Sequence, residues 1–390
     1  MHILQVINSL DPQGGGPAEQ AKRIAFSFNQ LGNTAEIVTL DPPDAPWLKD
    51  VKVNVHALGP YITKAYCFSP KLIPWLKQHT PEFDVVIVHG IWRYCSFAVW
   101  LVLRRTGKPY FVFTHGMLDP WFKKAYPLKH LKKWLYWPWA EYKVLRDARA
   151  VFFTSPQERL LSRQSFWLYK CKEEIVSYGV SVVTREDKDC SLVFLEKFPE
   201  LRDKRIILFL SRIHPKKGCD LLIRAFSRVA QLDETLRLVI AGPGDKKSLR
   251  NLRKLSERLR IGDKISWAPM LLNDSKWGAF QAAEIFILPS HQENFGVAVA
   301  ESLGCGVPVL ITNKVNIWDI VAQYNAGIVS DDNIEGVVKL LEGWLRLSPE
   351  EKSAMKIRAR ACFLENFDVK NVAKKLIATM RENGVMEEGK

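Results

Sequence analysis

Short runs of hydrophobic residues recur along the chain, each bounded by turn-forming residues and followed by a longer amphipathic stretch. This alternation is typical of parallel β-strands that are buried between helices. It predicts strands at residues 3–7, 35–40, 84–88, 110–113 and 150–153, and a second series at 206–210, 236–241, 264–267, 284–288, 307–311 and 327–329. Two such series indicate two α/β domains, each a parallel sheet covered by helices.

The chain has 390 residues, more than the ~250 to 300 at which a single hydrophobic core stops growing. We therefore place an N-terminal domain at residues 1–180 and a C-terminal domain at 204–366. Residues 181–203 carry little apolar periodicity and predict a linker. Residues 367–390 predict a helix whose apolar face is expected to pack back on the N-terminal domain. That face carries Val369, Val372, Leu376, Ile377 and Met380.

The charge balance sets the chain apart from an average globular protein. A hydrophobic content of 47% excludes a disordered or fibrous chain, but 56 Lys and Arg against 42 Asp and Glu give a net charge of +14. Such a balance indicates an anionic partner. Nucleic acid, anionic lipid and phosphate-bearing substrates all satisfy it.

The distribution of cysteines and apolar residues bears on the compartment. The first ten residues lack a basic segment followed by an apolar one, and no apolar run approaches the ~18 residues of a spanning helix. The seven cysteines include no CxxC pair, so they fit neither a disulfide framework nor a zinc site. We expect a cytoplasmic protein in a reducing environment.

In an open parallel sheet, ligands bind at the carboxyl ends of the strands, so the loops that follow the predicted strands are the candidates for chemistry. The first loop contains Gly14, Gly15 and Gly16, which let the backbone approach a phosphate or a sugar ahead of a helix. It is not a dinucleotide fingerprint, because Glu19 occupies the third glycine position. A flexible turn fits this loop equally well.

Two loops of the second domain have similar features. Arg212, Lys216 and Lys217 follow the strand at 206–210 and precede Gly218, an arrangement suited to neutralising a diphosphate, although a solvated basic loop would look the same. Gly242 follows the strand at 236–241 and permits close approach of a ligand, as the glycines of many ordinary turns do.

The most informative segment is residues 289–309. A polar loop presents Glu293 after the strand at 284–288, and a helix is expected to begin near Gly296, where free N–H groups can bind an oxyanion. Glu301 lies about one turn into that helix, where its carboxylate could bridge two vicinal hydroxyls such as those of a ribose. Glu293 would reach a hexose hydroxyl on the other side of the phosphates.

These motifs together resemble the retaining nucleotide-sugar glycosyltransferases of family 4, of the type that builds bacterial polysaccharides. The resemblance lies in the glycine-rich first loop, an Arg five residues before a Lys-Gly, and an E-x7-E element that ends in G-x-P-V. It is strong over residues 205–309 and looser in the first half. It implies the GT-B fold, in which two Rossmann-like α/β/α domains face each other across a cleft, with the donor site in the second domain.

The resemblance also implies roles for individual residues. Arg212 and Lys217 would hold the diphosphate, Glu293 the donor hexose and Glu301 the ribose. Other donor-binding positions would be Gly15, Gly16, Gly242, the backbone of Asn294, Phe295, Gly296 and Val297, and Met270 and Leu271 beside the base. His115 matches a histidine that lies beside the anomeric centre in the family, although a loop histidine satisfied by backbone groups is an equal alternative. His291 and Gln292 depart from the family pattern.

The mechanism that the resemblance implies retains the anomeric configuration without a protein nucleophile. The leaving phosphate oxygen would deprotonate the incoming hydroxyl while Arg212 and Lys217 stabilise the departing nucleotide, and with Glu293 and His115 they form the expected catalytic set. No metal and no cofactor is expected. The D-x-D sequence formed by Asp187 and Asp189 falls in the predicted linker and fits a solvated turn.

Residues 121–146 form a basic aromatic segment with seven Lys or Arg, four Trp, three Tyr and one acid, Glu141. This composition fits docking on an anionic membrane leaflet. Nucleic-acid binding uses the same residue types. Alternatively, Trp134, Leu135 and Trp137 face the core of the domain. With a sugar-nucleotide site elsewhere in the chain, we favour the membrane hypothesis and disfavour nucleic acid.

We therefore expect a hexosyltransferase that moves a sugar, with glucose from UDP-glucose as the first choice, to a glycan or lipid-linked acceptor in polysaccharide synthesis. It would be cytoplasmic or peripheral on the inner face of the plasma membrane. The alternatives are a nucleotide-sugar hydrolase or epimerase on the same scaffold, and a noncatalytic basic protein that binds membrane or nucleic acid.

Overall fold

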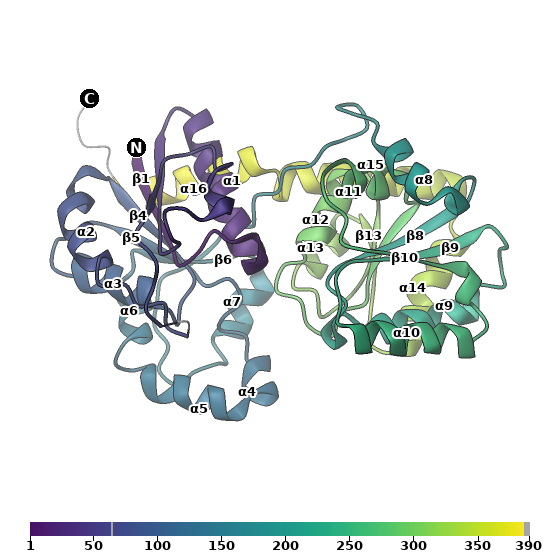
Figure 1. The fold of residues 1–390 in the computed structure, drawn as a ribbon, viewed down its shortest axis with the longest axis horizontal. Helices are drawn as coiled ribbons and strands as arrows, with labels where there is room; N and C mark the ends of the chain where they lie inside the picture. Colours follow the sequence, from purple (N-terminus) through teal and green to yellow (C-terminus); the bar gives the residue numbers. More distant parts are fainter. Residues whose placement is uncertain (64, 386–390) are drawn as a thin grey trace. The chain divides into compact units, whose positions relative to one another are not determined.

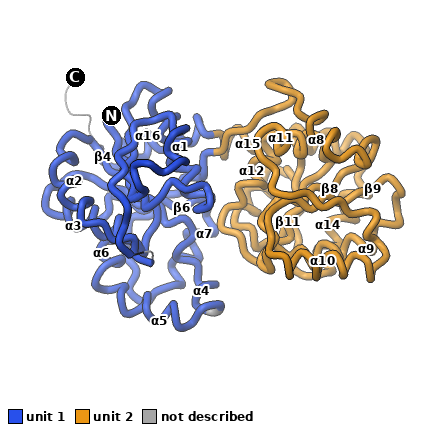
Figure 2. Tube along the Cα trace, viewed as in Figure 1, with its two compact units in different colours: residues 1–179, 369–390 blue, residues 180–368 orange. Residues whose placement is uncertain are grey.

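The computed structural model describes residues 1–63 and 65–385, apart from the side chain of Lys124. The chain divides into two compact units. Unit 1 comprises residues 1–179 and 369–390, and unit 2 comprises residues 180–368 (Figure 2). Each unit contains one parallel sheet with helices packed on it (Figure 1).

Unit 1 contains a seven-stranded sheet of order β3-β2-β1-β4-β5-β6-β7, and every strand pair in it is parallel. The strands are β1 (His2–Ile7), β2 (Thr34–Thr39), β3 (Val55–Ala57), β4 (Val85–His89), β5 (Tyr110–Phe113), β6 (Ala150–Phe153) and β7 (Glu173–Ile175). The α-helices are α1 (Gly16–Gln30), α2 (Leu72–His79), α3 (Tyr94–Leu103), α4 (Trp121–Ala125), α5 (Pro127–Tyr136), α6 (Glu141–Asp147), α7 (Pro156–Ser162) and α16 (Val369–Glu382).

The two faces of this sheet are buried in separate hydrophobic clusters. Ile3 and Val85 face one cluster with side chains from α1 and α16, while Leu4 and Val86 face the other with side chains from α2, α3 and α6. Successive residues of a strand point to opposite faces, so a continuous apolar run fills both clusters. Helix α16 lies against α1 in unit 1 (Figure 1).

Unit 2 contains a six-stranded parallel sheet of order β10-β9-β8-β11-β12-β13. Its strands are β8 (Arg205–Leu210), β9 (Leu236–Ala241), β10 (Ile265–Ala268), β11 (Ile285–Leu288), β12 (Val309–Thr312) and β13 (Gly327–Ser330). Its α-helices are α8 (Ser191–Lys197), α9 (Cys219–Val229), α10 (Lys246–Arg258), α11 (Asn273–Ala282), α12 (Val297–Gly304), α13 (Trp318–Gln323), α14 (Ile334–Arg346) and α15 (Pro349–Asn366).

All eleven strands expected from the hydrophobic pattern are present, with ends shifted by at most two residues. The pattern did not reveal β3 and β7, which are three-residue edge strands that are only half-buried. The five apolar residues expected on one face of the last helix are all buried in α16. The last five residues of the expected 367–390 helix lie outside the described part of the chain.

The segment 181–203 is not a linker, because it is packed into unit 2. It contains α8, whose Phe194 is fully buried and which lies against α11. The residues just before α8 are hydrogen-bonded to the Gln281 side chain on α11. Its Nε2 donates to the carbonyls of Val183 (3.2 Å) and Lys188 (3.0 Å), and its Oε1 accepts from the Cys190 N–H (2.7 Å). These bonds satisfy the backbone of an irregular stretch that lacks apolar periodicity.

The strand order reverses at one point in each sheet. In unit 1 the strands that follow β1 in sequence are added on one side of it, and those that follow β4 are added on the other side of the sheet. In unit 2 the same reversal occurs between β8 and β11. A reversal of this kind leaves the loops at the carboxyl ends of the two strands free to receive a ligand. The glycine-rich loop follows β1, and the Arg212 and Glu293 loops follow β8 and β11, so these three loops lie at the reversal points.

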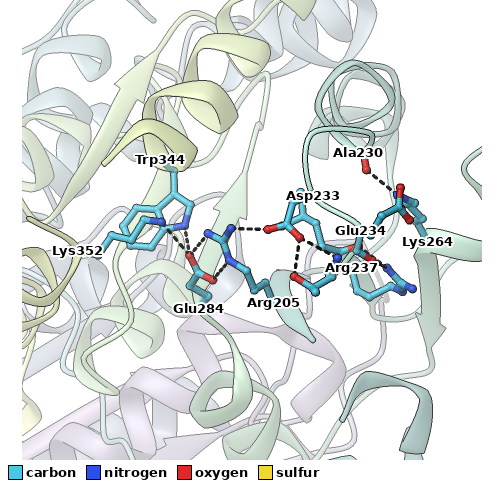
Figure 3. A network of polar contacts seen from close by, with 11 residues as sticks. Arg205, Ala230, Asp233, Glu234, Arg237, Lys264, Glu284, Trp344 and Lys352 are labelled. Atoms are coloured by element: carbon cyan, nitrogen blue, oxygen red, sulfur yellow. Dashed lines mark hydrogen bonds and ion pairs between the residues drawn. The ribbon is translucent and has the colours of Figure 1, made fainter. Parts of the chain in front are cut away.

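An ionic network joins the amino ends of the strands in the unit 2 sheet, opposite the carboxyl ends that carry the candidate loops (Figure 3). Arg205, the first residue of β8, donates from Nε and Nη2 to the two carboxylate oxygens of Glu284, each at 2.7 Å, and from Nη1 to Asp233 at 2.6 Å. The Trp344 indole N–H also donates to Glu284 (2.8 Å). Burial acts to raise the pKa of Glu284, but these donors outweigh it and the pKa lies below its ordinary value.

We expect the Arg205→Leu variant to lose about 2 to 3 kcal/mol of unfolding free energy at pH 7, because Glu284 keeps its charge and loses its bidentate partner. The pKa of Glu284 is lowered by folding, so the loss should shrink as pH falls below the unfolded value of ~4.3. Urea unfolding at pH 7 and pH 3.5 measures both effects. The control is Arg228→Leu, which breaks an exposed pair with Glu335 and should cost under about 1 kcal/mol; equal losses in the two variants would contradict the prediction.

Candidate functional site

The loops after β8 and β11 in unit 2 are packed directly against each other. A Cβ atom added to Gly218 would lie 2.1 Å from the carbonyl oxygen of Pro289, so only glycine fits there. Its φ of 65° also favours glycine. The His291 N–H donates to the Lys216 carbonyl at 2.8 Å, and Lys216 Nζ donates to Gln292 Oε1 at 3.1 Å. The basic loop and the Glu293 loop therefore form one continuous surface.

Lys217 and Glu293 form an ion pair across this contact. Lys217 is 9% exposed, and its backbone N–H donates to the His214 carbonyl at 2.8 Å. The backbone of Glu293 is fixed as well, because its N–H donates to Lys314 at 2.9 Å and its carbonyl accepts from Asn316 at 3.0 Å. The two residues that the sequence assigned to diphosphate and hexose thus lie side by side in fixed positions.

Three cations lie around His214 at the end of β8. Burial lowers the pKa of His214, and the charges of Lys216, Arg212 and Lys217 lower it further. The Arg212 side chain is exposed and forms no hydrogen bond or ion pair within the described part of the chain. The loop therefore concentrates positive charge, with one guanidinium available, where a diphosphate would be neutralised.

Helix α12 begins at Val297 after Gly296, whose φ is 79° and whose position carries no capping side chain. The N–H groups of Val297 and Ala298 therefore remain available to an anion, whereas that of Val299 donates to the Gly296 carbonyl at 2.8 Å. Glu301, in the second turn, is 2% exposed and accepts a hydrogen bond from Lys276 Nζ on α11 at 2.6 Å. Phe295 is 2% exposed and packs edge-on against Phe367, so only its backbone can meet a ligand.

The residues assigned to the base side differ from one another. Met270 is 60% exposed, whereas Leu271 is buried and can offer a ligand only its backbone. Gly242 is required for packing, because a Cβ atom there would lie 1.9 Å from the Ser211 carbonyl oxygen and its φ is 142°. This contact joins the loops after β8 and β9 and explains the glycine without a ligand.

In unit 1, the glycine-rich loop ends in an uncapped helix terminus. Gly15 is exposed with a φ of 78°, and α1 begins at Gly16 without a capping side chain. Asp11 accepts from the Gln13 N–H at 2.8 Å and so orders the loop ahead of the glycines. The N–H groups of Gly14 and Gly15 are already used within the loop, in bonds to the carbonyls of Asp11 (2.8 Å) and Pro12 (3.1 Å), so an anion would have to be met by the N–H groups at the start of α1.

His115 follows β5 and belongs to a chain of side chains that runs from Gln5 to Tyr178. Gln5 Nε2 donates to the Ala21 carbonyl at 3.2 Å, so its Oε1 faces His89 Nε2 at 2.6 Å. His89 therefore carries its proton on Nε2 and accepts on Nδ1, which lies 3.2 Å from His115 Nε2. The remaining Nδ1 of His115 accepts from the Tyr178 hydroxyl.

In this row of hydrogen-bonded side chains, both histidines are neutral. Burial lowers the pKa of His89 to about 3, and burial together with His89 lowers the pKa of His115 well below its ordinary value. Both ring nitrogens of His115 are thus engaged by side chains of unit 1, in place of the backbone partners considered from sequence. A catalytic role for His115 stays a prediction. In that role His115 would contact the substrate through its backbone, or its Nδ1 would give up the Tyr178 hydroxyl and bind the substrate instead.

Glu158 on α7 fixes the loop that carries His115. Its Oε1 accepts from the Thr114 hydroxyl at 2.7 Å and from the Gly116 N–H at 2.6 Å, and its Oε2 accepts from the Thr154 N–H at 2.8 Å. His115 and Gly116 have φ values of 50° and 73°. Their left-handed backbone is held by this buried carboxylate.

The D-x-D sequence is used in local turns of unit 2. Asp187 Oδ2 accepts from the Thr184 N–H and hydroxyl, and Asp189 Oδ1 accepts from those of Ser191. Within residues 1–63 and 65–385, no cluster of His, Cys, Asp and Glu is arranged to hold a metal ion. The seven cysteines are free thiols.

The basic aromatic segment divides between core and surface. Trp137 is fully buried, as the core alternative required, but Trp134 and Leu135 are 43% and 59% exposed, so that alternative is wrong for them. Leu128 and Trp139 are 78% and 72% exposed. Over the described part of the chain, no helix combines the length and hydrophobicity needed to span a bilayer.

Sequence reasoning missed several residues that build these sites. Lys276, which pairs with Glu301, lies in a helix with no distinctive motif. His89 and Tyr178 lie 26 and 63 residues from His115, and only the parallel sheet brings them to it. A polar residue at the carboxyl end of an apolar strand was the available signal for His89, since it ends β4.

Family models match both units. Residues 15–179 match the model described as a glycosyl transferase 4-like domain, and residues 194–361 match the model of glycosyl transferases group 1. The D-inositol 3-phosphate glycosyltransferase of Thermomonospora curvata is 32% identical over 137 residues, which are 33% of this chain and 32% of that protein. The chain thus aligns with about a third of the length of this curated relative.

Solved structures resemble the whole chain. The Anabaena protein HepE, in complex with UDP and glucose, has a TM-score of 0.76 and 16% identity, covering 98% of this chain and 100% of HepE. WaaG, a glycosyltransferase involved in lipopolysaccharide biosynthesis, has a TM-score of 0.66 and 17% identity, covering 99% of this chain and 100% of WaaG. At these identities the likeness establishes the fold alone.

The histidine chain predicts a pH-dependent stability. The folded pKa of His89, about 3, lies below the unfolded value of ~6.5, so the folded protein binds fewer protons and loses stability as pH falls through this range. We expect the His89→Gln variant, which cannot titrate, to lose less stability between pH 6.5 and 4.5, by up to about 1.4 kcal/mol per pH unit. Chemical denaturation across this range measures it, and identical slopes in the two proteins would refute the assignment.

Proposed function

Because the chain belongs to glycosyltransferase family 4 and has the GT-B fold, we propose that it is a retaining hexosyltransferase that uses a nucleotide diphosphate sugar. UDP-glucose is the proposed donor. UDP and glucose are bound in the structural neighbour HepE, which supports this choice. The proposed acceptor is a glycan or a lipid-linked sugar in polysaccharide synthesis, and the role of WaaG in lipopolysaccharide biosynthesis supports it.

The observation that carries this proposal is the Lys217–Glu293 pair at the β8 and β11 reversal point. The two side chains are held by separate loops, and the uncapped helix α12 starts four residues after Glu293, at Val297. A cation, a carboxylate and free N–H groups therefore meet where a diphosphate and a hexose would be bound together.

In the proposed reaction, Lys217 and Arg212 bind the diphosphate and stabilise the negative charge that grows on it as the bond to the sugar breaks. Glu293 orients the hexose and Glu301 binds the ribose hydroxyls. Glu301 would exchange its bond to Lys276 for these hydroxyls or share it with them. The departing phosphate oxygen accepts the proton of the incoming hydroxyl on the same face of the sugar, so retention requires no protein base. We propose no metal or cofactor.

We further propose that the basic aromatic segment binds an anionic leaflet, at the inner face of the plasma membrane. Leu128, Leu131 and Trp139 expose apolar surface, while Lys129 and Lys132 on α5 are also exposed. Exposed aromatic and leucine side chains flanked by lysines are the elements of an interfacial anchor. This surface lies within unit 1, and unit 2 holds the proposed donor site.

The function is tested by the Glu293→Ala variant. Hexose transfer from UDP-glucose should fall at least about 100-fold in kcat/KM, as when a group that stabilises a transition state is removed. UDP should still bind in calorimetry, since Arg212 and the α12 terminus remain. Glu335→Ala, at an exposed acid, serves as the control. A variant that transfers hexose at the wild-type rate would refute the role of Glu293, and a wild type that only hydrolyses UDP-glucose would indicate the hydrolase alternative.

Membrane binding is tested by the double variant Lys129→Gln, Lys132→Gln. Each cation contributes ~1 kcal/mol near an anionic surface, so partitioning to vesicles with phosphatidylglycerol should weaken about 30-fold. Vesicle sedimentation measures it. Lys246→Gln with Lys247→Gln, two exposed lysines of α10, should leave partitioning near the wild-type value. Equal binding of the wild type to neutral and anionic vesicles would contradict the proposal.

A further inference from the structure

A pocket of about 720 Å³ lies within unit 1, between the helices α4 and α5 and the chain at residues 164–167. Its lining includes Lys123, His130, Leu131, Trp134, Phe166 and Trp167. In Figure 1, α4 and α5 lie away from the strands of the sheet. The volume falls within the ~300 to 1,000 Å³ of sites that bind small molecules. None of the residues discussed for the donor site lines it.

The pocket has a rigid base and an exposed rim. Phe166, at its base, is 7% exposed and stacks on the fully buried Trp137 with ring centroids 4.3 Å apart. The Trp137 indole N–H donates to the Leu168 carbonyl at 2.5 Å and so fixes the same stretch of chain. At the rim, the ring centroids of Trp134 and Trp167 lie 6.2 Å apart, and the two side chains are 43% and 66% exposed. The base is part of the core, while the rim holds aromatic rings in solvent.

Positive charge lies on one side of this apolar pocket, where Lys123 belongs to the lining. Residues 120–140 contain five lysines and no acidic residue. Burial lowers the pKa of His130, and the charges of Lys123 and Lys133 lower it further, which reports a positive potential at the lining. A ligand that satisfies both features has a hydrocarbon part for the pocket and an anionic group for the lysines.

We propose that this pocket binds a single-chain lipid phosphate, with the first part of its hydrocarbon chain between Trp134 and Phe166 and its phosphate beside Lys123. The rest of the chain would stay in the leaflet, since a pocket of this volume takes only part of a long lipid. The inference rests on the proposed function and deepens it, because it assigns the lipid that carries the acceptor sugar to the single-chain phosphate class, while the sugar supplies the hydroxyl that reacts. A flat basic surface would suffice for leaflet binding alone, whereas a pocket with a buried base selects one chain.

The test uses the full chain and geranylgeranyl phosphate, titrated below its micelle concentration and followed by tryptophan fluorescence and calorimetry. Trp134→Ala and Lys123→Gln should each weaken binding at least tenfold. Leu232→Ala, at a leucine of unit 2 that is 69% exposed, should bind as the wild type does. Because the three substitutions lie on the surface, circular dichroism and the melting temperature should not change. Geranylgeraniol, which lacks the phosphate, should bind more weakly than the phosphate ester.

Two outcomes would overturn the inference. One is unchanged binding in both pocket variants, and the other is binding to phosphatidylglycerol vesicles without binding to the single-chain phosphate, which would leave only a general leaflet contact. UDP binding, measured in the same samples, separates this result from the donor proposal. A protein that binds geranylgeranyl phosphate and not UDP would keep the pocket and refute the donor site, and the reverse would refute only the pocket.

Discussion

The arrangement of the candidate site depends on close backbone contacts between loops at the carboxyl edge of the unit 2 sheet. Gly218 lies against the Pro289 carbonyl and Gly242 against the Ser211 carbonyl, at distances that leave no space for a Cβ atom. Because the strands are parallel, these loops emerge on one edge. The contacts then fix Lys217 beside Glu293, although 76 residues separate them in the chain. The glycines serve the site by letting its loops touch, in addition to any direct contact with phosphate.

Unit 1 fixes its own loop by a different physical means. His115 is held by neutral groups, since a charged imidazole would be unstable in the buried chain from Gln5 to Tyr178. Glu158 provides the complementary support, with its carboxylate oxygens accepting backbone and hydroxyl groups of the neighbouring turns. A left-handed turn at His115 is therefore sustained by hydrogen bonds that are sheltered from water, which strengthens them. Because both ring nitrogens of His115 are engaged, any contact of its ring with a substrate would require the loss of one of these bonds.

Hydrophobic periodicity was sufficient to predict eleven strands, and in unit 1 each of the five predicted strands supplies side chains to both buried clusters of the sheet. It could not reveal β3 and β7, whose half-buried edge positions impose no such pattern. Residues 181–203 were misread for a related reason: their packing on α11 depends on the Gln281 amide, a polar contact that leaves no periodic trace. The motif residues of the candidate site could be picked out by their spacing, but their partners Lys276 and Asn316 could not, since tertiary structure alone brings them there.

The charge of the chain is divided unequally, and the division has a physical consequence. Residues 1–180 hold 23 Lys and Arg against 14 Asp and Glu and contain nine of the 13 tryptophans. In unit 2 the cations of the β8 loop are few and fixed, as with Lys217 on Glu293. On α5, by contrast, lysines share the surface with exposed leucines and Trp134, and the exposed apolar groups would gain free energy on burial against an amphiphilic partner. The proposed donor site requires a few placed charges, whereas the proposed lipid contact requires many charges beside apolar groups, and the two units differ in this respect.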